Sequence, residues 1–189
     1  EFRQPHYLES FVAAILEVAV PRAGATLILG GDGRDFVAEA AQRILRLAAA
    51  WGVERVVIGV NGLLSTPAAS HLIRLHDATG GIILSASHNA GGPDGDFGVK
   101  FNGANGGPAL PAVTDAIADR AAALSAYDAI AHPDIPLDRV GGHTLGTMRV
   151  DVIDPVTDHA ALLESLVDMA AIRALFARGF TMRFDAMHA

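Results

Sequence analysis

A serine, a histidine and a lysine lie close together in a glycine-rich stretch at residues 80–102, GGIILSASHNAGGPDGDFGVKFN. The hydroxyl of Ser87 can attack phosphorus, and a phosphoserine can pass the group on again. Glycines let backbone N–H groups approach phosphate oxygens closely. His88 can carry a proton near neutral pH, and Lys100 can place positive charge on transferring oxygens or shuttle a proton. These residue types predict a loop that carries a phosphoryl group.

Other interpretations of the same stretch stay open at this point. A glycine-rich surface loop with an ordinary serine and histidine has the same pattern. The lipase elbow Gly-x-Ser-x-Gly is absent, and so is the Gly-Lys-Ser/Thr ending of a P-loop. In favour of chemistry, Lys100 is the only lysine among 14 basic residues, and all the others are arginine. Lysine and arginine differ in shape, hydration and ease of deprotonation, so this choice can have a chemical reason.

One further motif lies within this stretch and another precedes it. Asp94 and Asp96 have the i, i+2 spacing of a calcium loop, but the remaining ligands of that loop do not follow, so we interpret them as turn formers. Residues 30–34, GGDGR, lack the Gly-x-Gly-x-x-Gly spacing of a dinucleotide site. We interpret this run as a tight turn that presents Arg34, either to an internal salt bridge or to a phosphate.

The composition is that of a globular protein with a sizeable core. Of 189 residues, 51% are hydrophobic, and the net charge is −7 without long runs of one sign. Nucleic-acid binding is disfavoured because it needs a basic surface. The absence of cysteine excludes disulfides and cysteine zinc sites, and no histidines have metal-ligand spacing. No signal peptide or membrane-length apolar run is present, so we expect a cytoplasmic protein with no membrane partner.

Strand and helix patterns alternate along the chain. Strands are predicted at residues 25–29, 55–60, 81–85, 99–101, 147–153 and 180–185. Helices are predicted at residues 5–20, 35–51, 65–77, 111–124, 156–169 and 170–177, with loop and turn at 126–145. The alternation predicts a layered α/β/α fold with a mixed, largely parallel sheet. Loops that follow parallel strands meet at one edge of the sheet, where ligands bind.

Beyond these patterns, residues 80–109 resemble the phosphoserine loop of phosphoglucomutases of the α-D-phosphohexomutase superfamily. The usual form there is Thr-Ala-Ser-His-Asn-Pro-Gly-Gly, followed by Asp-Phe-Gly-Ile-Lys-Phe-Asn. The resemblance continues in order through LILGGDGRDF, NGLLSTPAAS, VIDPVTDHAALLESLVD, IRALFARGF and MRFDAMHA. It covers most of the chain and fits the long phosphoglucomutase branch better than the shorter phosphomannomutases.

The resemblance implies a role for each matching residue. Ser87 is implied to be the phosphorylated serine, and its phosphate is implied to be a ligand of a catalytic Mg²⁺ whose other ligands lie outside this chain. His88 is implied to transfer a proton or position substrate. Lys100 is implied to contact the phosphoryl group or act as acid or base. Arg34 and Asn89 are implied to support the site by binding substrate or phosphate.

The implied reaction interconverts glucose 1-phosphate and glucose 6-phosphate through glucose 1,6-bisphosphate, which also serves as activator. A family enzyme has four domains, so the resemblance implies that residues 1–179 are domain I and residues 180–189 begin domain II. Domains II–IV are implied to carry the other Mg²⁺ ligands, the sugar-discriminating loop and a phosphate-binding loop. We therefore expect a chain truncated at both ends, inactive alone, whose partners are a sugar phosphate and the missing domains.

Two residues depart from the family loop. Ser85 stands where the family has threonine, which keeps the hydroxyl, and Ala90 stands where it has proline, which restores an N–H and frees the backbone. Two alternatives to phosphoglucomutase therefore remain. One is a related mutase acting on mannose or glucosamine phosphates. The other is a non-catalytic relative that kept the fold for binding or structural work, which Ala90 favours and Ser87, His88 and Lys100 oppose.

Overall fold

The computed structural model describes residues 1–186, which form one six-stranded sheet in the order β4-β3-β1-β2-β6-β5. The strands are β1 (Thr26–Gly31), β2 (Arg55–Leu63), β3 (Gly80–Leu84), β4 (Val99–Gly103), β5 (Gly141–Leu145) and β6 (Met148–Ile153). The four central strands run parallel, and the edge strands β4 and β5 are antiparallel to their neighbours. The expected α/β fold with a mixed, largely parallel sheet is confirmed.

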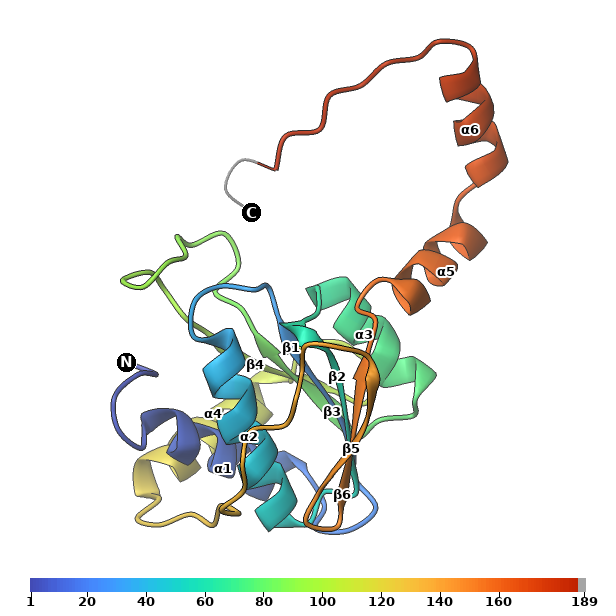
Figure 1. Cartoon of the computed structure of the whole chain (residues 1–189). Helices are drawn as coiled ribbons and strands as arrows, with labels where there is room; N and C mark the ends of the chain where they lie inside the picture. Colours follow the sequence, from blue (N-terminus) through green and yellow to red (C-terminus); the bar gives the residue numbers. More distant parts are fainter. Residues whose placement is uncertain (187–189) are drawn as a thin grey trace.

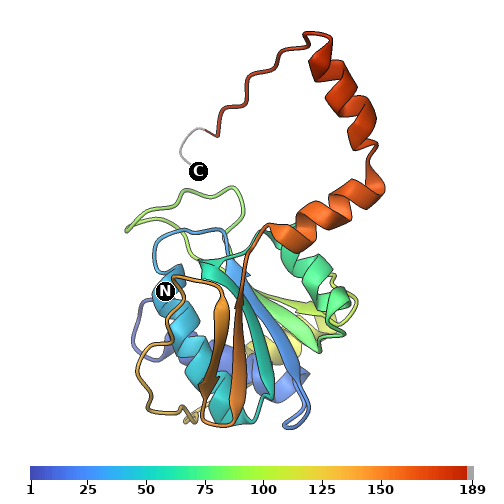
Figure 2. The same cartoon turned by 45° about the vertical axis from the view of Figure 1, so that its right-hand side comes forward.

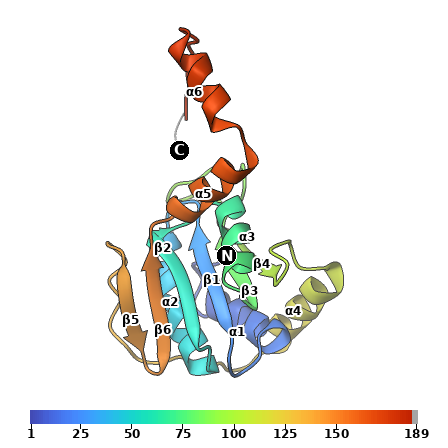
Figure 3. The same ribbon diagram turned by 90° about the vertical axis from the view of Figure 1, so that its right-hand side faces the viewer.

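Helices cover both faces of this sheet (Figures 1 and 3). One face carries α1 (Tyr7–Ala19), α2 (Val37–Trp51) and α4 (Pro111–Ala123). The other face carries α3 (Thr66–Leu75), against which α5 (Thr157–Leu166) packs. The last helix, α6 (Met169–Ala177), lies away from the sheet, and the segment after it turns back from the far end of this helix (Figure 2).

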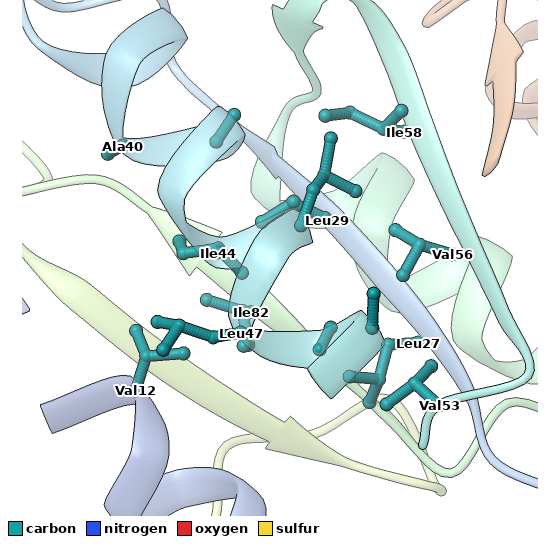
Figure 4. Packing of buried hydrophobic residues seen from close by; sticks show 14 of the residues in the cluster. Val12, Leu27, Leu29, Ala40, Ile44, Leu47, Val53, Val56, Ile58 and Ile82 are labelled. Carbon is teal, nitrogen blue, oxygen red and sulfur yellow. The ribbon is translucent and has the colours of Figure 1, made fainter. Parts of the chain in front are cut away.

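The core lies between the sheet and these helices. Strands buried on both faces need apolar side chains in both directions, which explains the continuous aliphatic runs of β1, β2 and β3. Ile28, Val57 and Ile83 point to the face that α3 covers. The larger cluster, on the side of α1 and α2, includes the residues labelled in Figure 4: Val12, Leu27, Leu29, Ala40, Ile44, Leu47, Val53, Val56, Ile58 and Ile82.

Two predicted segments have a different secondary structure from the one expected. The sequence predicts loop and turn for residues 126–145, but the last five of these residues form β5, which pairs with β6 in a hairpin. The pair Gly141-Gly142 resembles a turn, whereas the hairpin turn lies at Gly146, whose φ is +61°. Residues 180–185 were expected to be a strand but are irregular, because no strand of the described chain lies beside them to pair with. Their apolar side chains stay exposed, Phe184 to 83%.

The expected division at residue 180 stays a prediction, and its last residues, 187–189, lie outside the described part of the chain. The helix expected over 156–169 ends earlier, at Leu166, because Val167 is extended. The next helix, α6, begins at Met169 and is capped by Asp168, whose carboxylate accepts a hydrogen bond of 2.9 Å from the Ala171 N–H. Neither α5 nor α6 buries a residue, so the arm formed by α5, α6 and the residues after them contributes little to the core.

Candidate active site

The loops that follow β1 and β3 lie side by side at the carboxyl edge of the sheet (Figure 1). The two strands are parallel neighbours with Gly31 opposite Leu84, and the Asp32 N–H extends the pairing by donating to the Leu84 carbonyl at 3.2 Å. A side chain on Gly31 would meet that carbonyl at 2.3 Å, so the close approach requires glycine. This pairing brings the GGDGR turn next to the serine loop.

Ser87 and Lys100 are in direct contact. The Lys100 Nζ donates a hydrogen bond of 2.6 Å to the Ser87 Oγ. Lys100 lies on β4, whose neighbouring residues Val99 and Phe101 pack against the core, so strand alternation turns the lysine to the opposite face. The antiparallel pairing of β4 with β3 then returns the lysine to the loop that leaves β3. Both side chains are exposed, so an external group can reach them.

The backbone of Ser87 adopts an uncommon conformation. Its φ is +57°, in the left-handed region that costs a non-glycine residue roughly 1–2 kcal/mol. The Ser87 N–H donates to the Ser85 Oγ at 3.0 Å, and the Ser85 hydroxyl donates to the Asp32 Oδ2 at 2.7 Å. Ser85 is buried, and its own N–H donates to the Gly98 carbonyl. These hydrogen bonds connect the backbone of the exposed Ser87 to the buried Ser85 and, through it, to Asp32.

Arg34 joins the two ends of the loop. Its Nε and Nη2 donate to the Asp32 carboxylate at 2.9 and 2.8 Å, so the internal salt bridge is formed. Its Nη1 donates to the Asp96 carbonyl at 2.6 Å, and Nη2 also donates to the Ser87 carbonyl at 3.3 Å. The Arg34 side chain is only 7% exposed. Phosphate binding by Arg34 stays a prediction, since most of its donors face the protein.

Asp32 and Arg34 hold each other in the charged state. Burial alone raises the pKa of the Asp32 carboxyl, but hydrogen bonds from Arg34 and Ser85 outweigh burial and leave this pKa below its ordinary value. The hydrogen bond to Asp32 raises the pKa of the Arg34 guanidinium. The carboxylate is therefore an acceptor at neutral pH, and the pair adds little net charge beneath Ser87.

The tip of the loop is folded on itself. Asn89 donates from Nδ2 to the Asp96 carboxylate at 2.9 Å, and the Asp96 N–H donates to the Ala90 carbonyl at 2.9 Å. Phe97 anchors the returning chain by packing edge-on against Phe36, with ring centres 5.1 Å apart. Asn89 is exposed but supports the loop, and its predicted contact with phosphate stays a prediction.

His88 is exposed next to Ser87 and makes no hydrogen bond within residues 1–186. Its predicted proton-transfer role therefore stays a prediction. Among the described residues, no three His, Cys, Asp or Glu side chains are arranged to hold a metal ion. The donors of this chain do not by themselves fit Mg²⁺, since Ser87 offers a hydroxyl and the Asp32 carboxylate is paired with Arg34.

A cavity of about 630 Å³ lies beside Lys100, lined mostly by apolar residues of α1, α3, β4 and α4. Ser87 and His88 do not contribute to its lining as described, so the cavity lies beyond the loop. The candidate active site is accordingly the exposed surface around Ser87 and Lys100, backed by the Asp32, Ser85 and Arg34 contacts.

A sequence model described as phosphoglucomutase/phosphomannomutase, alpha/beta/alpha domain I, matches residues 1–128. The chain belongs to the phosphoglucomutase/phosphomannomutase family. Phosphoglucomutases from Rhizobium radiobacter and Schizosaccharomyces pombe are each 48% identical to it, over 100% and 99% of the chain. The open form of parafusin, a phosphoglucomutase from Paramecium, is 38% identical over 100% of the chain, with a TM-score of 0.92.

This member of the family spans only part of its relatives. It covers 35% and 34% of the Rhizobium and Schizosaccharomyces proteins and 36% of the parafusin chain. Other domains of those proteins are therefore missing from it. Within residues 1–186, no helix is both long and apolar enough to cross a membrane.

The structure brings together Ser87 and Lys100, the two residues for which the sequence predicts phosphoryl chemistry. The sequence predicts no role for Asp32 or for the Asp96 carbonyl. The role of Asp32 depends on the pairing of β1 with β3, which places it next to Ser85, 53 residues away. An acidic residue two positions before an arginine, directly after a strand, was the one available signal.

Proposed function

We propose that this chain is domain I of a phosphoglucomutase, in which Ser87 carries the phosphoryl group that is exchanged with glucose phosphates. The observation that carries the proposal is the contact between an exposed serine in a left-handed conformation and the only lysine of the sequence, 2.6 Å apart. The names of the relatives support glucose phosphates as substrates rather than other hexose phosphates.

The proposed reaction has two transfers that balance each other. In the first, the bond between phosphorus and the Ser87 Oγ breaks, a bond from phosphorus to the free hydroxyl oxygen of the sugar phosphate forms, and the proton of that hydroxyl ends on the Ser87 Oγ. This gives glucose 1,6-bisphosphate. After the bisphosphate reorients, the bond between its other phosphorus and the sugar oxygen breaks and a bond from phosphorus to the Ser87 Oγ forms. The Ser87 hydroxyl loses its proton in this transfer, and the sugar oxygen takes up a proton.

Lys100 has the position to assist both transfers. Negative charge develops on the Ser87 Oγ when the phosphoryl group leaves, and the Lys100 ammonium donates a hydrogen bond to this atom. The exposed loop lets the sugar approach, while its buried base keeps the oxygen in place. Mg²⁺ would neutralise phosphoryl oxygens, and Ser87, through its phosphate, would supply one of its ligands. The other ligands are proposed to come from the remaining domains.

Replacing Ser87 by alanine in the complete protein tests this proposal. We expect Ser87→Ala to abolish interconversion of glucose 1-phosphate and glucose 6-phosphate while leaving the melting temperature near that of the wild type, because an exposed loop serine contributes little packing. Ser125→Ala, at an exposed serine after α4, is the matched control and should keep full activity. Near-normal steady-state turnover in Ser87→Ala would exclude the phosphoserine mechanism.

A further inference from the structure

We infer that Asp32 and Ser85 are positioning residues that set the backbone of Ser87 for phosphoryl transfer, an inference that rests on the proposed function. Neither residue touches the Ser87 hydroxyl. They form a series in which the Asp32 carboxylate accepts from the Ser85 hydroxyl, and the Ser85 oxygen accepts from the Ser87 N–H. The series ends at the residue with the left-handed backbone.

The direction of these hydrogen bonds is fixed by the carboxylate. An ionised carboxylate can only accept, so the single proton of the Ser85 hydroxyl must point at Asp32. The free lone pairs of that oxygen are then available to the Ser87 N–H. Arg34 keeps the carboxylate ionised by pairing with it, so the Ser85 oxygen is a standing acceptor for the Ser87 N–H.

The acceptor has consequences for the reacting oxygen. Because the left-handed region is unfavourable for serine, Ser87 stays there only while the surrounding structure compensates. The hydrogen bond to Ser85 supplies this compensation, and the left-handed backbone aims the Ser87 Oγ at the Lys100 Nζ. Without the acceptor, Ser87 can relax to the common regions and its hydroxyl leaves the ammonium.

Arg34 acts on the same backbone from the other side. Four of its five N–H groups are engaged, one from Nε, one from Nη1 and two from Nη2. Two of these bonds end on the carbonyls of Ser87 and Asp96, so the guanidinium ties the start of the loop to its return. The hydroxyl of residue 85 is thus the part of this network that can be removed with the smallest change in charge and volume.

The test compares Ser85→Ala, Ser85→Thr and the control Ser125→Ala in the complete protein. Transfer of a phosphoryl group from glucose 1,6-bisphosphate to Ser87 is followed by intact mass in a single turnover, and kcat and KM are measured in the steady state. We expect Ser85→Ala to lower the transfer rate and kcat roughly ten-fold, as the loss of about one hydrogen bond implies. KM for glucose 1-phosphate should stay within about two-fold, because the hydroxyl is buried away from substrate.

Ser85→Thr distinguishes the hydroxyl from the packing of the site. Threonine keeps the oxygen and adds a methyl group, so we expect transfer within about two-fold of the wild type. A Ser85→Ala protein that transfers at the wild-type rate would overturn the inference, and so would a threonine variant as slow as the alanine variant. If wild-type Ser87 itself cannot be phosphorylated, the proposed function fails instead.

Amide hydrogen exchange gives a readout that does not depend on activity. In Ser85→Ala the peptide covering residues 85–98 should exchange faster than in the wild type and in Ser85→Thr. Equal exchange in all three proteins would contradict the positioning role whatever reaction the protein catalyses.

The series predicts coupling between its two members. Asp32→Asn should also slow transfer, because an amide can donate and so reverse the Ser85 hydroxyl, and Asp134→Asn, at an exposed aspartate paired with Arg46, is its control. In the Asp32→Asn background, Ser85→Ala should lower the rate of phosphoryl transfer by less than about two-fold, because the hydrogen bonds from Asp32 to Ser87 are already disrupted. A full ten-fold loss in that background would show that the two residues act independently.

Discussion

Replacing Lys100 by methionine should remove the ammonium that contacts Ser87 while keeping most of the length of the side chain. The Nζ–Oγ distance of 2.6 Å places this charge where negative charge develops as a phosphoryl group leaves. Removal of one donor aimed at such a charge lowers kcat by about 10²–10³-fold, or roughly 2.7–4 kcal/mol. Lys100 is exposed, so water screens its charge and we expect the lower end of that range, about 10²-fold.

The assay follows conversion of glucose 1-phosphate by the complete protein, with melting temperature measured on the same samples. KM should change less than about three-fold, because the lost interaction forms mainly in the transition state. Lys100→Arg is the control that keeps the charge but changes its geometry, and it should fall between wild type and Lys100→Met. An unchanged kcat in a folded Lys100→Met protein would refute the role assigned to Lys100.

Three further predictions concern the loop, the sheet and the arm. Gly98→Ala places a carbon 2.5 Å from the Ser85 carbonyl oxygen. This variant should lower the free energy of unfolding by roughly 1–3 kcal/mol in thermal unfolding and should slow phosphorylation of Ser87. A variant that is phosphorylated at the wild-type rate would show that the base of the loop is not rigid. For Asp151, burial raises the pKa, but hydrogen bonds from Arg149 and Arg55 outweigh it and leave the pKa below its ordinary value of 3.8. The stabilising effect of the Asp151 carboxylate is therefore complete above its unfolded-state pKa and is lost as pH falls through its folded-state pKa. The free energy of unfolding in urea should accordingly depend less on acid pH in Asp151→Asn than in the wild type. Identical pH slopes of this free energy in the two proteins would contradict the prediction. Helix α6 and the residues after it expose six large apolar side chains: Ile172, Leu175, Phe176, Phe180, Met182 and Phe184. In gel filtration, the isolated chain 1–189 should therefore self-associate more than a chain ending at Asp168. Elution of both chains as monomers would contradict this prediction.

Local patterns predicted most of the fold. Aliphatic runs such as residues 56–58 and 82–84 predict strands that the structure confirms. The helix predicted to begin at residue 65 is α3, whose cap residue Ser65 accepts a hydrogen bond of 3.3 Å from the Ala68 N–H. The two failures were segments whose state depends on a partner. Two glycines in β5 resemble a turn until β6 is placed beside them, and residues 180–185 have strand-like alternation but no neighbouring strand among residues 1–186.

The candidate site divides in the same way. Ser87 and Lys100 are recognisable from residue type and family resemblance, and their contact follows from the antiparallel pairing of β3 with β4. The roles of Asp32 and Ser85 were not predictable, because they depend on the register of two strands distant in the sequence and on the left-handed backbone of Ser87. Neither the strand register nor the backbone conformation of Ser87 can be predicted from a local sequence pattern.

The measurement that tests the central proposal most directly is mass spectrometry of the complete protein purified from its own cells, intact and after digestion. We expect a single phosphoryl group on Ser87 that is discharged when glucose phosphate is added and restored by glucose 1,6-bisphosphate. A Ser87 that carries no phosphoryl group and cannot be charged by glucose 1,6-bisphosphate would contradict it, and would favour a member of the family that kept the fold without the reaction.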